Sequence, residues 1–336
     1  MIISYALTLI AAAGVMFWRL ADHDLDRWQS ADFDFNNGEA SVSGALWLPD
    51  GPPLAAVVIV HGDGAQDRLS GGGYAPFINT FLDRGIAVAS WDKPGVGRSG
   101  GNWLHQSMAN RVDETRAALR LLKQRFDAIP LGALGFSQAG WVLPQLSQED
   151  ADFLVLIGAA VSWQDQGDYY TSVRLAALGM DRAAIDETIT AQRQTDDRIF
   201  GPNAQAEHAP AGMSTDRWHF IRRNRQADAR PYLADLDLPL FAIWGADDLN
   251  VDAGRDSAIY TRALEARNTG SEITLWPKAT HGLLKSSPYN WQLVEDWSWI
   301  AKARFVLEGR FAFAPGALKE ITNWITEQKQ QGRTAQ

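Results

Sequence analysis

The sequence predicts an α/β protein with a mostly parallel sheet. Short, continuous apolar runs recur along the chain, as expected for strands buried on both faces of a parallel sheet. Segments with helical spacing and charged faces alternate with these runs. Before them, residues 32–35 and 40–48 alternate between apolar and polar side chains, which indicates half-exposed antiparallel strands joined by a turn at Asn36-Asn37-Gly38.

The elements of the core can be assigned in chain order. The continuous runs predict strands at residues 55–60, 86–90, 131–136, 153–157, 240–244 and 273–276. Helical spacing predicts helices at residues 76–84, 108–126, 139–146, 255–267 and 315–328. Each strand but the last is thus followed by a helical crossover or by an insertion.

One long region breaks this alternation. Between the runs that end near residue 159 and start near residue 239 lie about eighty residues, too many for a structureless loop. Residues 175–195 and 215–227 have helical character. We therefore expect a helical cap inserted at residues 161–236, between the two parts of the core at residues 31–160 and 237–330. A shorter excursion occupies residues 285–314.

Residues 1–20 form a separate hydrophobic segment. Residues 2–18 carry no charged side chain and are nearly long enough to span a membrane. A secretory signal usually has Lys or Arg before its apolar core, and none is present here. An uncleaved anchor, a signal peptide and a helix packed on the protein itself all remain open. We expect a membrane-anchored or exported protein; Arg19 and Arg27, with acidic neighbours, leave the face of the membrane undecided.

Composition excludes several classes of function. The net charge of −9, without a basic cluster, argues against nucleic acid and anionic membrane surfaces as partners. The chain has no Cys, so it has no disulfide, thiolate nucleophile or Cys-ligated metal.

Gly135-Phe136-Ser137-Gln138-Ala139-Gly140 is the most informative motif. It places a serine between a predicted strand and a predicted helix, where a sharp turn strains the backbone and requires small neighbours two residues away. An ordinary strand-to-helix turn would also explain this motif taken alone. Its setting would expose the hydroxyl of Ser137 beside a helix N-terminus, which suits a nucleophile.

A glycine-rich loop, His61-Gly62-Asp63-Gly64, closes the first continuous run. Such a loop can point a backbone N–H at a developing oxyanion, with a second donor in the residue after the nucleophile. The amides of Asp63 and Gln138 are the expected donors. The side chain of His61 is expected to fix the loop rather than to take part in the chemistry.

Two more motifs end strands at the same edge of the sheet, where ligands bind in open α/β sheets. Asp248 follows the run at residues 240–244 and is the expected partner of a histidine, with Asp247 as its rival and a turn or helix cap as the structural alternative. His281, beside a glycine after the last run, is the expected general base. The order Ser137, Asp248, His281 is the order Ser…Asp/Glu…His.

With these motifs, residues 33–328 resemble the α/β-hydrolase superfamily. The matching pieces are His61-Gly-Asp-Gly64, Asp92-Lys-Pro-Gly95-Val-Gly97-Arg-Ser99, the Ser137 motif, Gly245-Ala-Asp-Asp248 and His281-Gly282. The chain looks most like bacterial serine esterases of the dienelactone-hydrolase and acyl-peptidase-like group, although Ala139 stands where that family usually has glycine. The resemblance implies a mostly parallel eight-stranded sheet flanked by helices.

Gly95-Val-Gly97-Arg-Ser-Gly100 also matches the dinucleotide fingerprint G-x-G-x-x-G. Asp92-Lys-Pro separates it from the strand, and no helix clearly starts at its glycines, so we interpret it as a structural loop. Without a P-loop, an H-E-x-x-H motif or metal-ligand spacing among the histidines, we expect no cofactor and no metal.

Taken together, these features predict a serine hydrolase that cleaves small-molecule carboxylic esters through an acyl-enzyme intermediate. Thioester, amide or peptide hydrolysis by the same residues is the alternative, and a non-catalytic binding protein of this fold is the third. Aromatic residues of the expected cap could line an acyl pocket or only attach the cap to the sheet: Trp163, Tyr169, Tyr170, Trp218, Phe220 and Tyr232.

Overall fold

A computed structural model describes residue 14, residues 19–265, residue 267 and residues 270–334. The central sheet contains β1 (Gln29–Asp32), β4 (Gly44–Leu48), β5 (Ala55–Val60), β6 (Ile86–Trp91), β7 (Leu131–Phe136), β8 (Phe153–Ile157), β9 (Leu240–Gly245) and β10 (Glu272–Trp276). The strand order is β1-β4-β6-β5-β7-β8-β9-β10. β4 runs antiparallel to β1 and β6, and every pair from β6 to β10 is parallel. The expected mostly parallel, eight-stranded sheet is confirmed.

The α-helices are α2 (Ala75–Asp83), α3 (Met108–Arg125), α4 (Trp163–Ala177), α5 (Arg182–Phe200), α6 (Thr215–Asn224), α7 (Arg230–Asp235), α8 (Ala253–Leu264), α9 (Ser286–Tyr289), α10 (Trp299–Glu308) and α11 (Ala317–Thr334). Six short 3₁₀ turns accompany them in the described residues: η1 (Ala21–His23), η2 (Trp103–His105), η3 (Ser137–Trp141), η4 (Leu143–Gln145), η5 (Ala206–His208) and η6 (Gly309–Ala312).

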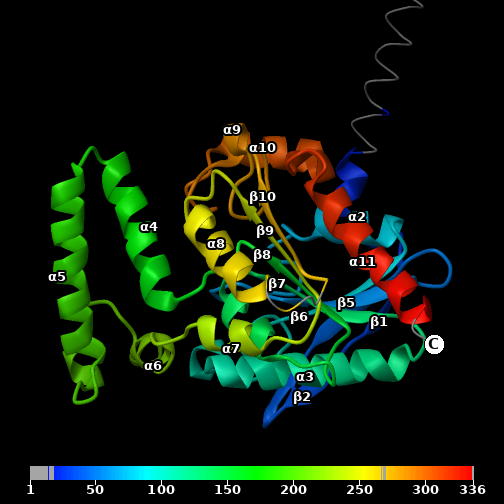
Figure 1. Cartoon of the computed structure of the whole chain (residues 1–336), viewed down its shortest axis with the longest axis horizontal. Coiled ribbons are helices and arrows are strands. Elements are labelled where there is room, and N and C mark those ends of the chain that lie inside the picture. Colours follow the sequence, from blue (N-terminus) through cyan, green and yellow to red (C-terminus); the bar gives the residue numbers. More distant parts are fainter. Residues whose placement is uncertain (1–13, 15–18, 266, 268–269, 335–336) are drawn as a thin grey trace, which may run out of the picture.

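The buried strands contribute side chains to two hydrophobic cores, one on each face of the sheet, because successive side chains of a strand point to opposite faces. Val58 and Val60 of β5 belong to the core covered by α3 and α8, whereas Val57 and Ile59 belong to the core covered by α2 and α11. Figure 1 shows α3 running along one side of the sheet and α2 and α11 along the other. This two-sided burial explains why these strands have continuous apolar sequences.

The prediction of one strand at residues 40–48 is wrong. It forms two strands: β3 (Ala40–Val42) pairs with β2 (Phe35–Asn37) in a separate hairpin, and β4 pairs with β1. Between them, the N–H of Ser43 donates to Ser99 Oγ at 2.9 Å and that of Gly44 to Asp34 Oδ1 at 3.1 Å. Side-chain acceptors thus replace the sheet hydrogen bonds at the break. The strand expected at residues 32–35 is divided between the end of β1 and the start of β2, and Asn36 and Asn37, expected in the turn, belong to β2.

Residues 163–235, between β8 and β9, form α4 to α7. The single helix expected at residues 175–195 is wrong, because α4 and α5 are separated by a turn. Gly179, with a φ of +84°, follows α4, and the side chain of Asp181 caps α5 by accepting from the N–H of Ala184. In Figure 1 the pair α4–α5 stands away from the sheet. The division into core and cap stays a prediction.

The excursion at residues 285–314 contains α9, α10 and η6. Asp22, near the start of the described chain, binds to it. The Asp22 carboxylate accepts from the Arg310 backbone N–H at 2.9 Å and pairs with its guanidinium. A Cβ on Gly309 would lie 2.7 Å from Asp22 Cβ, so only glycine allows this close approach. In the part of the chain that the structure describes, no helix is long and apolar enough to cross a bilayer. The expected hydrophobic segment at residues 2–18 lies outside that part, apart from residue 14.

Candidate active site

Ser137 stands at a strained turn directly after β7. Its φ is +50°, a value that side-chain-bearing residues rarely adopt. A Cβ on Gly135 would lie 2.5 Å from Ala139 Cβ, and one on Gly140 would lie 2.8 Å from Ala159 Cβ. The turn therefore depends on small residues at the positions that the sequence motif provides. Ser137 itself is only half-buried.

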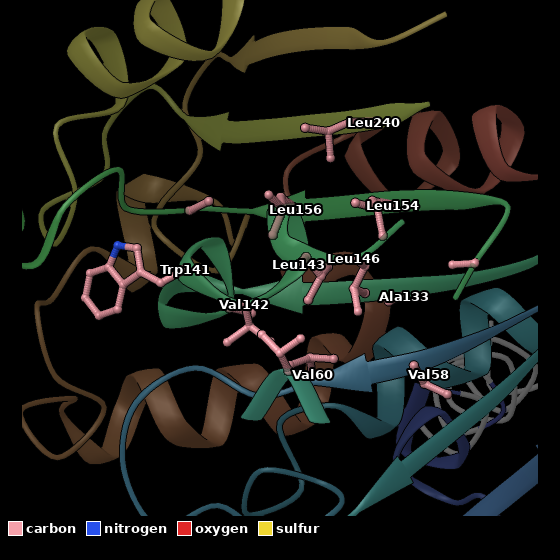
Figure 2. Packing of buried hydrophobic residues seen from close by; sticks show 14 of the residues in the cluster. Val58, Val60, Ala133, Trp141, Val142, Leu143, Leu146, Leu154, Leu156 and Leu240 are labelled. Carbon is pink, nitrogen blue, oxygen red and sulfur yellow. The ribbon is translucent and has the colours of Figure 1, made fainter. Parts of the chain in front are cut away.

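The helix expected at residues 139–146 is not an α-helix. The structure has two short turns, η3 and η4, instead. Pro144 explains the difference, because it has no N–H to donate to the carbonyl four residues earlier. Figure 2 shows how Trp141, Val142 and Leu143 still pack into the core with Val60. Packing rather than a long helix therefore holds the segment after Ser137.

Asp248 and His281 meet beside the ends of β9 and β10. His281 Nδ1 lies 2.7 Å from Asp248 Oδ2. Asp248 is buried, and its Oδ1 accepts from the backbone N–H groups of Asn250 and Val251 at 2.7 and 3.0 Å. The rival Asp247 is exposed and only its backbone carbonyl accepts a hydrogen bond, from Asn290. The structure thus brings Asp248, and not Asp247, to the histidine.

Electrostatics prepare His281 to hold a proton. Burial lowers the pKa of its imidazole, but the charge of Asp248 and their hydrogen bond raise it by more, so the net pKa lies above the ordinary value of 6.5. Because Nδ1 faces Asp248, Nε2 is the nitrogen that can accept a proton. A glycine, Gly245, lets the two loops meet: a Cβ there would lie 2.2 Å from the carbonyl oxygen of Thr280.

Ser137 and His281 flank the same residue, Gly158. Phe136 of β7 pairs with Ile157 of β8, so Ser137 and Gly158 follow neighbouring strands at the same level. The imidazole lies directly against Gly158, since a Cβ on this glycine would be 2.9 Å from His281 Nδ1. The three residues expected to act together are thus gathered at one edge of the sheet.

The loop at residues 61–64 lies against the serine. A Cβ on Gly62, the residue before Asp63, would be 3.4 Å from Ser137 Cβ. The amide of Gln138 precedes the first hydrogen bond of η3 and is therefore free of a helical partner. Gln138 Nε2 also donates to Asp63 Oδ1 at 2.9 Å. The two expected oxyanion donors are thus tied together by their side chains.

Two buried basic residues support this loop, and sequence reasoning did not find them. Lys93 Nζ donates to the carbonyls of Gly62 and Gly64 at 2.6 and 2.9 Å. Arg111 donates to the carbonyl of His61 and to Gln138 Oε1. In a trans peptide the C=O and N–H point in opposite directions. The amine on the Gly62 carbonyl therefore directs the Asp63 N–H, in the same peptide, away from Lys93 and outward.

Burial shifts the pKa values of Lys93 and of the neighbouring His61. It lowers the pKa of the Lys93 amine well below its ordinary value, and the nearby Arg111 charge lowers it further. It also lowers the pKa of His61 to about 3, with Lys93 adding to the effect. His61 is therefore neutral, and its Nε2 lies 2.6 Å from the carbonyl oxygen of Trp91. This contact agrees with a role in fixing the loop. For Lys93, the sequence signal was its position after a buried strand; for Arg111, on a charged helix, there was none.

The dinucleotide-like glycines have a structural explanation. A Cβ on Gly97 would lie 2.4 Å from Asp92 Oδ2, so the loop wraps closely around this carboxylate. Arg68 holds the same carboxylate, with its NH2 group 2.7 Å from Oδ2. Within the described residues, no three His, Asp or Glu side chains are grouped to hold a metal ion.

The inserted helices contact the site's loops. Tyr169 donates its hydroxyl to the Asp248 carbonyl at 2.8 Å. Gln292, from the excursion, donates to the carbonyls of Leu249 and Tyr170 at 2.8 and 3.0 Å. Trp163 lies 5.5 Å, between ring centroids, from Trp141.

The aromatic residues of this segment divide between packing and exposure. Trp218 and Phe220 are almost fully buried and act in packing, whereas Tyr232 is exposed. Arg217 of α6 approaches the glycine-rich loop, with its NH2 group 3.7 Å from Asp63 Oδ2.

Comparison with known proteins identifies the family. The family described as serine aminopeptidase, S33, matches residues 51–287, well over half of the chain. No curated protein matches the chain.

Solved structures of similar fold include the following three. An esterase of Pyrococcus furiosus is 16% identical with a TM-score of 0.56, and the match covers 91% of each chain. A carboxyl esterase of Bacillus coagulans is 16% identical with a TM-score of 0.52, covering 74% of this chain and 90% of its own. Est1E of Butyrivibrio proteoclasticus is 11% identical with a TM-score of 0.53, covering 89% and 98%. The fold and the extent of the family match agree, and the chain belongs to the serine aminopeptidase S33 family of α/β-hydrolases.

Proposed function

We propose that the protein is a serine hydrolase that cleaves carboxylic esters through an acyl-enzyme intermediate. The observation that carries the proposal is the contact of 2.7 Å between His281 Nδ1 and Asp248 Oδ2 at the strand edge that also bears the strained Ser137 turn. A buried carboxylate that orients an imidazole at the same strand edge as a half-buried serine is the arrangement that can activate a hydroxyl. Membership of a hydrolase family supports the same reaction class.

In the proposed mechanism, Ser137 Oγ attacks the acyl carbonyl while His281 Nε2 takes its proton. Asp248 stabilises the resulting imidazolium. The backbone N–H groups of Asp63 and Gln138 stabilise the negative oxygen of the tetrahedral intermediate. His281 then protonates the leaving alcohol, and water attacks the acyl-enzyme with His281 again acting as base.

The test is fluorophosphonate labelling of the full chain. The wild type should be labelled and Ser137→Ala should not. Ser30→Ala, at an exposed serine of β1, is the matched control and should label like the wild type. If the folded wild type resists several fluorophosphonates of different size, Ser137 is not activated and the binding-protein alternative replaces this proposal.

Peptide or amide hydrolysis is the second candidate, because the matching family is described as serine aminopeptidase. A p-nitrophenyl ester and a p-nitroanilide with the same acyl group separate the two, since both release a coloured product. Because p-nitrophenolate is a better leaving group than p-nitroaniline, each kcat/KM is divided by the rate constant of the uncatalysed hydrolysis, and we expect the higher value of this ratio for the ester. A comparable or higher value for the anilide, above all for an aminoacyl anilide with a free amino group, would favour the peptidase.

A further inference from the structure

α10 presents an apolar surface to solvent where a surface helix normally presents polar residues. Its residues Trp299 and Ile300 are 78% and 59% exposed, and Val306 and Leu307 are both 45% exposed. The residues before it add to this surface. We call the whole set the α10 apolar surface; it comprises Trp291, Leu293, Val294, Trp299, Ile300, Val306 and Leu307. So many exposed large apolar side chains on one helix and the segment before it indicate a surface that is covered in use.

The opposite side of α10 is already occupied. Ala301 is buried, and the ring of Phe305 packs against Tyr289 and Trp297 at centroid distances of 6.3 and 5.9 Å. Glu308 accepts from Lys285 and Arg304. The helix is therefore held in place on the protein, and its exposed apolar residues do not result from a loose element.

The chain that follows residues 2–18 arrives at the packed side of α10 and at η6, the turn directly after this helix. The Arg19 guanidinium stacks on Phe311, 5.2 Å from its ring centroid, and His23 packs against Phe305 at 5.4 Å. Residues 2–18 carry no charge and are nearly long enough to cross a bilayer. A bilayer that received these residues would therefore meet the protein beside Arg19, at η6 and the adjoining end of α10.

The chemistry of the surface fits a lipid interface. Tryptophan is enriched where membrane meets water, and this surface exposes Trp291 and Trp299. The exposed charges around it have both signs: Lys302 and Arg304 on α10, and Glu295 and Asp296 just before it. Apolar insertion, and not attraction to anionic lipids, would therefore drive the contact, in agreement with the net charge of −9.

We propose that the α10 apolar surface docks on a lipid bilayer, beside the point at which residues 2–18 join the described chain. In Figure 1 α10 lies at the same edge of the molecule as the start of that chain, and α3 lies at the opposite edge. Docking in this way would turn α3 away from the membrane. Two other occupants, residues 2–18 folded back onto the protein and a second copy of the chain, are outcomes of the test.

The absence of cysteine makes a local test simple. An environment-sensitive fluorophore is attached to Ile300→Cys in the full chain, which is then reconstituted in phosphatidylcholine vesicles that contain a doxyl-labelled lipid quencher. Lys123→Cys, exposed on α3, is the matched control, and Val306→Cys is a second site on α10. All three sites are exposed, so labelling is compatible with folding.

The proposal expects a shift of emission to shorter wavelength and loss of most of the signal to the lipid quencher at residues 300 and 306, with neither effect at residue 123. Water-like emission at all three sites overturns it. A shift at residues 300 and 306 without quenching by lipid also overturns it, because the cover is then protein. Gel filtration under reducing conditions then detects a dimer if the cover is a second copy of the chain. If the cover is the folded-back segment, a variant lacking residues 2–18 loses the shift.

Discussion

Adding a single methyl group at Gly158 should disable the proposed catalytic base. Gly158 has a φ of +59°, and an alanine Cβ there would lie 2.8 Å from the backbone oxygen of His281 and 2.9 Å from its Nδ1. Ordinary contacts begin near 3.4 Å, so the imidazole must withdraw by about half an ångström. That movement acts directly on the bond of 2.7 Å to Asp248 and on the position of Nε2.

The size of the effect follows from geometry. A misplacement of about 1 Å can lower catalysis about 100-fold, so we expect Gly158→Ala to lower kcat about 10- to 100-fold with little change in KM. Alanine with a positive φ also costs about 1–2 kcal/mol of folding stability. Gly179→Ala is the matched control, because Gly179 has a φ of +84° with nothing within 4 Å of an added Cβ.

The assay is steady-state hydrolysis of a short p-nitrophenyl ester, with thermal melting to establish folding. Both variants should melt at a lower temperature than the wild type, and only Gly158→Ala should lose activity. A folded Gly158→Ala protein with kcat within about twofold of the wild type would refute the assignment of His281 as the base, because the displaced imidazole would then not matter.

Three further predictions concern buried titratable groups. Lys93→Met leaves the Gly62 and Gly64 carbonyls without their donor; it should lower kcat about 10- to 100-fold at similar KM in the ester assay, a loss no larger than that of one oxyanion donor. The rate of fluorophosphonate labelling should rise with pH through a midpoint above 6.5, because the neutral form of His281 appears there. Asp248→Asn should lower the pH of that midpoint, and it should lower kcat about 10⁴-fold. Burial raises the pKa of Asp256 from 3.8 to about 6, so the native state favours the protonated acid and the free energy of unfolding falls as pH rises through this range. Asp256→Asn keeps an acceptor for the Val161 N–H and carries no charge at any pH. It should therefore raise the melting temperature at pH 8 but not at pH 4.

The sequence predicted those parts of the fold and site in which a single requirement, such as burial or a strained turn, restricts residues that are neighbours in the chain. Burial on both faces gives β5 its unbroken run of apolar residues, and the strained Ser137 requires the small Gly135 and Ala139 two residues away. The turn between α4 and α5 was also readable, since Gly179 and Asp181 are typical helix-ending and helix-starting residues, but helical spacing on both sides concealed it.

Lys93 and Arg111 could not be predicted in this way. A lysine is normally exposed, and its burial here depends on carbonyl groups of Gly62 and Gly64, about thirty residues away in the chain. Arg111 lies on α3 among other charged residues, and only the fold turns it toward Gln138. Such contacts are tertiary, so a local pattern can at most place Lys93 after a buried strand and cannot show what its amine binds.

The hydrogen bonds that hold the Asp248 loop also set an order on the assembly of the protein during its synthesis. Asp248 leaves the ribosome long before Asn290 and Gln292, which bind the carbonyls of Asp247 and Leu249. A nascent chain that ends before these residues can form most of the sheet, including β9, yet its acidic loop lacks two of its attachments. The two outer attachments of this loop therefore form only after nearly nine-tenths of the polypeptide has been translated, whereas the Asn250 and Val251 amides can hold the carboxylate earlier.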